Sequence, residues 1–446
     1  MEYPGSKFTR RIRITTLLAF IAAFFIISPV VILYSAGYRF DFKNGLLLET
    51  GSLSVDILPL TATVYLDGLK IDQAMPIRLN NLTPHKYNLK ISASGHYDWE
   101  KQIEISRNKT TYIKEFILLK KSKPKLITPD TAAGISISAS GRYLAYSIFR
   151  NNETELVIED EQKKNKNLIF RLSGALTLLW ATHNDTLAVA SGVGNGNRRR
   201  VSVIDVVTGN MTDVRSADPI LKYLWGETAN PNLYYGTKDG IYSFTPHSGQ
   251  VSLITNSKFL DWQIDNEILW TMDINTSTAE LMISKDTLGF RKVFNSFTTI
   301  GNEPTKTLAN TKFETIEHDT VLLRDKAENI YYIVRANAKF AINASKYYLS
   351  RFNNWWLFWS PYELWTYSED DEPYLLNRSG VKFENILPLD KYNTLALHRD
   401  GKISALFPFF YIERELVDDS VKVMTADPEA RVIYYSNDKG IWKLNY

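Results

Sequence analysis

The 446-residue chain contains no cysteine. It therefore has no disulfide framework, no thiol nucleophile and no thiolate metal ligand, which excludes a small disulfide-rich secreted module. A strong charge of one sign is also missing, because 52 basic residues stand against 49 acidic ones, a formal net charge of +3. Charges so balanced give no electrostatic footprint for nucleic acid, and we expect no nucleic-acid partner.

Catalytic and cofactor motifs are missing too. There is no GxSxG elbow, no helical HExxH pair and no Walker lysine after a glycine-rich loop, and the six histidines are scattered. We therefore predict no catalytic residue, no cofactor and no metal site, and a protein that is not an enzyme.

One long apolar run is present and carries no charge, from Thr15 to Tyr34. It is long enough to cross a bilayer, and it predicts a transmembrane helix over residues 12–36. The arginines at 10, 11 and 13 favour a cytoplasmic tail over residues 1–11 and export of everything after the helix. A cleaved signal peptide is the alternative, but its apolar region is shorter and it ends in a small-x-small site.

The remainder is rich in strand-forming aromatics, which make up 13% of the chain and include 25 tyrosines. We predict an all-β protein beyond the helix. Residues 37–50 form a juxtamembrane β-ribbon or linker, in which Tyr38 to Phe42 alternates and Asn44-Gly45 supplies a hairpin turn. Some 400 exported residues exceed one core, so at least two domains follow.

Residues 51–119 read as a compact set of short strands. Period-two alternation is clear over Ala62 to Leu66 and Tyr87 to Ile91, with Asp67-Gly68 as a tight turn. The segment resembles the PEGA domain family in the order of its markers: Pro59, Ala62 to Gly68, Pro76, Asn81-Leu82, Tyr87-x-Leu89, Gly95-His96-Tyr97, Ile103 and Ile105. The resemblance implies a β-sandwich common on surface and envelope proteins, with no catalytic residue.

Residues 120–446 follow a basic joint, Lys120 to Lys125, and repeat a strand pattern about every forty residues. The segment resembles β-propellers of the TolB-like and WD40-like kind. Eight units can be proposed, and seven is the alternative if the fifth unit is an insertion. Their second strands lie near Tyr143, Leu187, Leu233, Ile268, Val321, Trp356, Leu395 and Val432. The last unit lacks a strand, which Pro124 to Thr128 can supply.

Three features could face a ligand. Arg198, Arg199 and Arg200 end the glycine-rich loop and suit an anionic polymer, although a blade hairpin explains the loop. Trp355, Trp356, Trp359 and Trp365 are the densest aromatic cluster and suit a carbohydrate or peptide platform, although core packing explains them. Four carboxylates, Glu369 to Glu372, lack the oxygen spacing of a calcium loop.

The sequence favours a cell-envelope protein anchored in the membrane by its single N-terminal helix. Its propeller would bind an envelope protein or a cell-wall polymer. The alternative is a hydrolase or lyase that acts on surface polysaccharide or peptide in the propeller channel. That reading rests on the fold alone.

Overall fold

The computed structural model describes residues 10–35, 38–41, 46–150, 153–163, 167–192, 199–275, 277–278, 280–287, 290–297, 299–300, 303–304, 310–336, 338–350, 355–368 and 372–446. The chain divides into two compact units, Met1–Ser122 and Lys123–Tyr446. Each unit has its own strands and its own buried side chains.

The first unit begins with a single helix, α1 (Arg10–Ser35). Its span Ile14–Ser35 has a mean hydropathy of 2.7, is buried nowhere, and is long and apolar enough to cross a membrane. Apolar side chains surround the helix, with Phe20 71% and Ile26 70% exposed. A helix that is apolar all round needs an apolar medium rather than water.

A short ribbon follows the helix, as the alternation predicted. β1 (Tyr38–Asp41) pairs antiparallel with β2 (Leu46–Glu49). The Tyr38 hydroxyl donates to Glu49 Oε1 over 2.6 Å. The turn predicted at Asn44-Gly45 lies outside the described residues.

The rest of the first unit is a sandwich of two sheets with strand orders β6-β3-β9 and β5-β4-β7-β8. The strands are β3 (Gly51–Leu58), β4 (Thr63–Leu66), β5 (Leu69–Ile71), β6 (Ile77–Leu82), β7 (Lys86–Ser92), β8 (Trp99–Glu104) and β9 (Thr110–Ile117). Alternate residues of β3 are buried, which is the pattern of a strand with one face in a core. Trp99 stacks on Phe116 with ring centroids 5.1 Å apart, joining the two sheets.

The tight turn predicted at Asp67-Gly68 is confirmed. Leu66 pairs with Leu69 across it, and both turn residues have positive φ, 48° and 81°. These backbone angles favour Asp or Asn followed by Gly. Asp67 Oδ1 also accepts a hydrogen bond from the Asn88 backbone N–H over 2.8 Å, so the carboxylate stabilises the sandwich locally.

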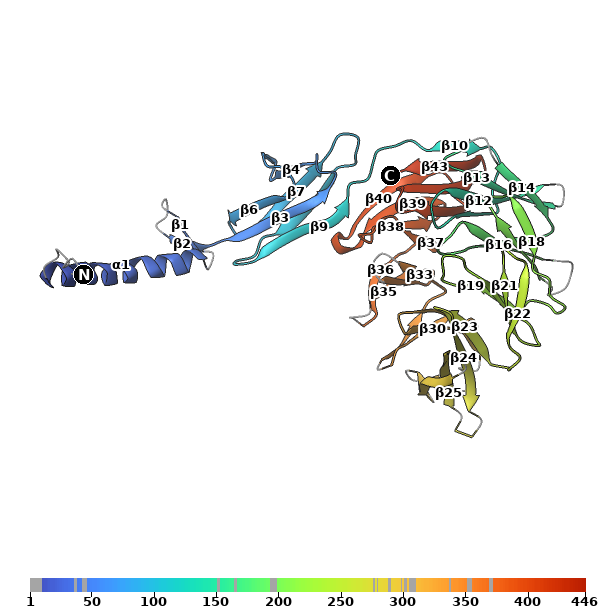
Figure 1. Ribbon diagram of the computed structural model, residues 1–446. Coiled ribbons are helices and arrows are strands. Elements are labelled where there is room, and N and C mark those ends of the chain that lie inside the picture. Colours follow the sequence, from blue (N-terminus) through green and yellow to red (C-terminus); the bar gives the residue numbers. More distant parts are fainter. Residues whose placement is uncertain are drawn as a thin grey trace, which may run out of the picture. The chain divides into compact units, whose positions relative to one another are not determined.

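The second unit contains eight four-stranded antiparallel sheets in its described residues (Figure 1). The first four sheets are β11 (Gly134–Ile137), β12 (Tyr143–Arg150), β13 (Glu153–Asp160), β14 (Asn167–Leu172); β15 (Leu176–Trp180), β16 (Thr186–Gly192), β17 (Arg199–Asp205), β18 (Asn210–Asp213); β19 (Lys222–Trp225), β20 (Leu233–Gly236), β21 (Ile241–Thr245), β22 (Gln250–Thr255); and β23 (Asp261–Asp265), β24 (Ile268–Asn275), β25 (Glu280–Thr287), β26 (Phe290–Phe297).

The next three sheets are β29 (Thr311–Glu317), β30 (Thr320–Asp325), β31 (Ile330–Val334), β32 (Lys339–Asn343); β33 (Lys346–Ser350), β34 (Trp355–Trp359), β35 (Glu363–Tyr367), β36 (Tyr374–Arg378); and β37 (Phe383–Pro388), β38 (Leu395–Arg399), β39 (Lys402–Phe407), β40 (Ile412–Asp418). A small pair, β27 (Thr299–Ile300) and β28 (Glu303–Pro304), precedes them, and a 3-10 turn, η1 (Pro408–Phe410), joins β39 to β40.

The eighth sheet joins the two ends of the unit. β41 (Val423–Asp427), β42 (Val432–Asn437) and β43 (Gly440–Asn445) take their fourth strand from β10 (Lys125–Thr128). Lys125 lies opposite Lys443, and β10 runs beside β43 in Figure 1. The prediction that the segment from Pro124 to Thr128 completes the last repeat is confirmed.

The second strands predicted from the repeat are the second strands of the eight sheets. The fifth unit, which had the weakest pattern, forms a complete sheet, because β30 pairs with β31 from Val321↔Val334 to Asp325↔Ile330. Its first strand is β29, as the segment from Lys312 to Ile316 predicted. The number of blades in a closed propeller stays a prediction of eight.

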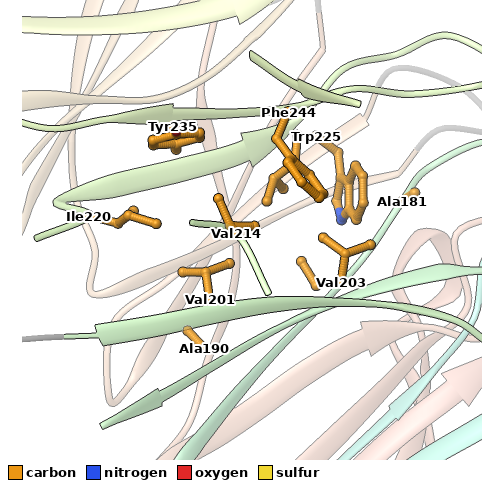
Figure 2. Close-up of a cluster of buried hydrophobic side chains, with 11 residues drawn as sticks. Ala181, Ala190, Val201, Val203, Val214, Ile220, Trp225, Tyr235 and Phe244 are labelled. Carbon is orange, nitrogen blue, oxygen red and sulfur yellow. The ribbon is translucent and has the colours of Figure 1, made fainter. Parts of the chain in front are cut away.

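The core of the second unit lies between neighbouring sheets. Figure 2 shows the cluster between the sheets of β15–β18 and β19–β22, where Ala190, Val201 and Val203 face Tyr235 and Phe244. Short residues on one sheet leave room for rings on the next, so the two faces interdigitate. Trp225 Nε1 donates to the Leu179 carbonyl over 2.8 Å and bonds the two sheets directly.

Candidate functional site: a cationic groove across three sheets

A groove of about 780 Å³ lies between the second and third sheets of the propeller unit. Its lining is mostly Asn, Thr and Asp side chains that already serve local turns. Asp205 Oδ1 accepts from the backbone of Val207 and Thr208 over 2.9 and 3.3 Å, and Asn184 Oδ1 accepts from Thr186 over 3.1 Å. These groups hold the chain's own backbone, so the lining offers little free chemistry.

A second groove, of about 620 Å³, has a different character. It lies at one end of the third, fourth and fifth sheets, where the first strands β19, β23 and β29 begin. The turn between β20 and β21 and the loop from β22 to β23 add to its wall. Its volume is in the range of small-ligand sites in proteins.

Five lysines and two carboxylates line this second groove, and we call it the cationic groove. They are Lys222, Lys238, Lys258, Lys312, Lys326, Asp261 and Glu314. No arginine is among the described residues that line it. The groove therefore carries an excess of flexible ammonium groups.

Lys222 and Asp261 form the floor of the cationic groove. Lys222 Nζ lies 3.2 Å from Asp261 Oδ2 and donates to the Trp262 carbonyl over 2.6 Å. Asp261 Oδ2 also accepts the backbone N–H of Phe313 over 2.7 Å. One buried carboxylate thus connects β19, β23 and β29, and removing it would leave a desolvated ammonium group. Burial lowers the pKa of Lys222 although Asp261 opposes the shift.

Close approach of β20 to this floor depends on Gly236. A Cβ at that position would lie 2.7 Å from Trp262 Nε1. The glycine leaves room for the Trp262 ring against β20, and Lys222 Nζ lies 5.5 Å from the ring centroid. The indole and the carboxylate together hold Lys222 in place.

Glu314 is the second carboxylate of the groove. Burial raises its pKa, while Arg324, Lys326 and Lys222 oppose that shift. Arg324 Nη1 lies 3.9 Å from Glu314 Oε1, a loose ion pair. The pKa values of Glu314 and Lys222 are thus both shifted by burial, and each group influences the other. Such pairs of shifted groups occur at functional sites and also in structural ion networks.

The remaining lysines form the rim. Lys312 Nζ donates to the Leu260 carbonyl over 2.6 Å, and Lys238 Nζ lies 3.0 Å from Asp218 Oδ1. Lys258 and Lys326 are exposed and form no ion pair within the part of the chain that the structure describes. These two rim lysines act on Asp239 and Glu314 only through longer-range electrostatics and keep exposed ammonium groups at the mouth of the groove.

The opposite end of the same first strands is acidic. Asp265, the last residue of β23, is buried, and its pKa is raised to about 6 by burial and by the charges of Glu227, Glu317 and Asp319. Among the described residues no group of three or more His, Asp or Glu side chains is arranged to hold a metal ion. The acidic end and the cationic groove give the three sheets a charge asymmetry along their first strands.

Three of the four tryptophans proposed as a ligand platform are buried. Trp355, Trp356 and Trp359 are 5%, 1% and 3% exposed, and Trp365 is half-buried. Along β34 the side chains alternate, so Trp355 and Trp359 pack toward the seventh sheet and Trp356 packs toward the fifth. Rings buried between sheets cannot stack on a ligand unless the sheets separate.

Of the three arginine candidates, only Arg200 has a described side chain, and it does not line the cationic groove. Arg198 and the side chain of Arg199 lie outside the described residues. Arg200 is exposed on β17 and forms an ion pair with Asp213, which lowers the pKa of that carboxyl. The carboxylate run is described only at Glu372, which is exposed.

Sequence reasoning missed the cationic groove because its residues come from five separate segments of the chain. Lys222 and Glu314 are far apart in the chain and share no motif. Lysines at strand starts and turns also look like ordinary solvated positions. Only the knowledge that successive first strands begin at the same end of the molecule would bring them together.

Comparison with known proteins bears on the fold. Residues 50–117 match the family model for the PEGA domain. No curated protein matches the chain. Similar solved structures include the β-propeller domain of Cps50 (Swd1) from Myceliophteria thermophila, with 11% identity and a TM-score of 0.44 over 72% of this chain and 99% of that one.

Two further similar structures come from proteins with different printed names, a protease and a lyase. The β-propeller domain of the Trilobed protease from Pyrococcus furiosus has 12% identity and a TM-score of 0.44, over 65% of this chain and 99% of that one. An oligogalacturonate lyase in complex with manganese has 8% identity and a TM-score of 0.41, over 71% and 98%. No activity is transferred at such similarity. The chain combines an N-terminal apolar helix, a PEGA domain at residues 50–117 and a β-propeller.

Proposed function

We propose that this protein is a membrane-anchored binding protein of the cell envelope, whose propeller offers the cationic groove to an envelope protein or a cell-wall polymer outside the cytoplasm. The observation that carries the proposal is α1. Its span Ile14–Ser35 is apolar on every side and buried nowhere in the protein, so lipid is the medium that suits it. A PEGA domain and a propeller on such an anchor would keep a binding surface attached to the membrane.

The orientation follows from charge. Three arginines precede the apolar span, and positively charged flanks stay in the cytoplasm. We expect the N-terminal tail inside and both folded units outside. An anchor also keeps its apolar helix, whereas a signal peptide would lose it.

The test uses the absence of native cysteine. Ser6→Cys and Lys391→Cys are made separately in the full chain, and intact cells are treated with a membrane-impermeant maleimide. We expect Lys391→Cys to be labelled in intact cells and Ser6→Cys only after lysis, in a band of full length. The cysteine-free parent gives the background. Labelling of Ser6→Cys alone in intact cells would reverse the topology, and loss of the N-terminal label from the mature band would indicate cleavage.

The second candidate function is a hydrolase or lyase. The observation that favours it is the nearness of Glu314 and Lys222, whose pKa values burial shifts in opposite directions, one up and one down. Its test is release of new chain ends from envelope polysaccharide or peptide by the purified full chain. Activity lost in Glu314→Gln, with folding intact, would support this candidate over simple binding.

A further inference from the structure

We infer that the cationic groove binds a polyanionic cell-wall polymer, with Lys258, Lys312 and Lys326 contacting its phosphate or carboxylate groups. This inference rests on the proposed function, because the groove meets such a polymer only outside the cytoplasm. It goes further in naming the ligand charge, the contact residues and the residues that build the site.

The lysines of the groove differ in whether they already have a partner within the protein. Lys222, the most buried of the five lysines, already faces Asp261 and the Trp262 carbonyl. Its role is to join the strands rather than to meet solvent. Lys258 and Lys326 are exposed and form no ion pair among the described residues, and Lys312 contacts only a backbone carbonyl there. With five lysines against two carboxylates in the lining, a ligand that enters the groove meets a net positive charge.

The kind of cation in the groove also bears on the ligand. A guanidinium binds one planar carboxylate in a fixed fork, whereas an ammonium on a flexible stem is a point charge with rotatable donors. The groove is lined by lysine and by no described arginine. Such a site tolerates many anion geometries, which suits a repeated charge along a polymer better than a single specific acid.

The spread of the lysines bears on the ligand as well. Lys258 precedes β23, Lys312 lies in β29, and Lys326 lies in the turn after β30. They come from two neighbouring sheets that share the groove wall, with Asp261 bonded to β29 beneath them. Positive charges contributed by two adjacent sheets attract a chain that carries repeated negative charge, and salt weakens that attraction.

The experiment uses the full chain in detergent and measures fluorescence anisotropy with four labelled probes: short polyphosphate, alginate oligomers, neutral dextran and single-stranded DNA of equal charge. We expect binding of one or both polyanions, weakened by added salt, and no binding of dextran. The double variant Lys258→Gln/Lys326→Gln should bind about tenfold more weakly at low salt, because two charge contacts with the polyanion are lost. The stronger polyanion tells whether phosphate or carboxylate is preferred.

The matched control is Lys382→Gln/Lys391→Gln, which removes the same charge from exposed lysines of the propeller unit outside the groove. We expect its affinity to stay within about twofold of the parent. Equal weakening in both double variants would overturn the site, since it would reduce binding to overall charge. Absence of polyanion binding, or tighter binding of single-stranded DNA of equal charge, would overturn the ligand class. Neither result depends on topology, which the cysteine labelling tests separately.

Discussion

Two buried aspartates of the propeller unit have opposite electrostatic surroundings. Asp160 accepts a paired contact from Arg142, with Nη2 2.6 Å from Oδ2, and also the backbone N–H groups of Gln162 and Lys163. These donors lower its pKa to about 2. Asp265 has burial and three nearby carboxylates instead, which raise its pKa to about 6.

We predict that Asp265→Asn stabilises the protein at pH 8. A carboxyl whose folded pKa is raised contributes stability below its unfolded pKa of about 3.8 and loses that contribution as the pH rises through 6. Removing the charge should increase the free energy of unfolding by on the order of 2 kcal/mol at pH 8 and by clearly less at pH 4.5. Urea unfolding at the two pH values measures the difference.

Asp160→Asn is the control of opposite sign. Its depressed pKa gives stability above about pH 3.8 that is lost only as the pH falls through 2. The free energy of unfolding of this variant should be lower than that of the parent by about 1 to 2 kcal/mol at both pH 4.5 and pH 8. If Asp265→Asn destabilised the protein at pH 8 as Asp160→Asn does, the electrostatic account of Asp265 would be wrong.

At the scale of the element, β10 is the strand on which closure depends. Ile127 packs against the cluster of Ala132, Leu144 and Tyr434, whereas Leu126 is 41% exposed on the other face. We predict that Ile127→Asp in the full chain lowers the free energy of unfolding of the propeller by about 2 to 3 kcal/mol, because a charge enters an apolar contact.

Leu126→Asp is the matched control on the same strand and should cost about 0.5 kcal/mol or less. Denaturant midpoints of the two variants report the difference. Equal losses would mean that β10 is held by backbone pairing alone and that its inner face does not anchor the ring.

At the scale of the molecule, we expect the propeller unit to unfold as one cooperative body. Each buried cluster joins consecutive sheets, and the first and last strands pair in one sheet. We predict that a chain beginning at Lys121 unfolds in a single calorimetric transition. A chain beginning at Thr131, which lacks β10 and leaves β43 as an open edge, should lose about 3 kcal/mol or more.

Equal stability of the two chains would refute closure through β10. Separate transitions in the longer chain would indicate independent sheets, as in an open repeat array. A crystal structure of the chain that begins at Lys121 would count the blades directly. We expect eight blades, with the sheet of β29–β32 as the fifth.

The sequence by itself determined the features that depend on neighbouring residues. The apolar run without charge determined the helix, the Asp67-Gly68 pair determined a turn with two positive φ values, and period-two alternation determined the strands of the sandwich. The forty-residue repeat also determined the second strand of each sheet, because every unit repeats the same local pattern. Even the strand from Pro124 to Thr128 followed, since a ring of sheets must pair its ends.

Only the tertiary structure decided which side chains meet. Trp355 and Trp356 are adjacent in the sequence, yet they pack toward different neighbouring sheets, and nothing local distinguishes a buried ring from an exposed one. Lys222, Asp261 and Lys312 are scattered in sequence and come together because three first strands begin at the same end. The physical reason is that burial and electrostatics act through space, and their strength depends on which other segments exclude water from the site.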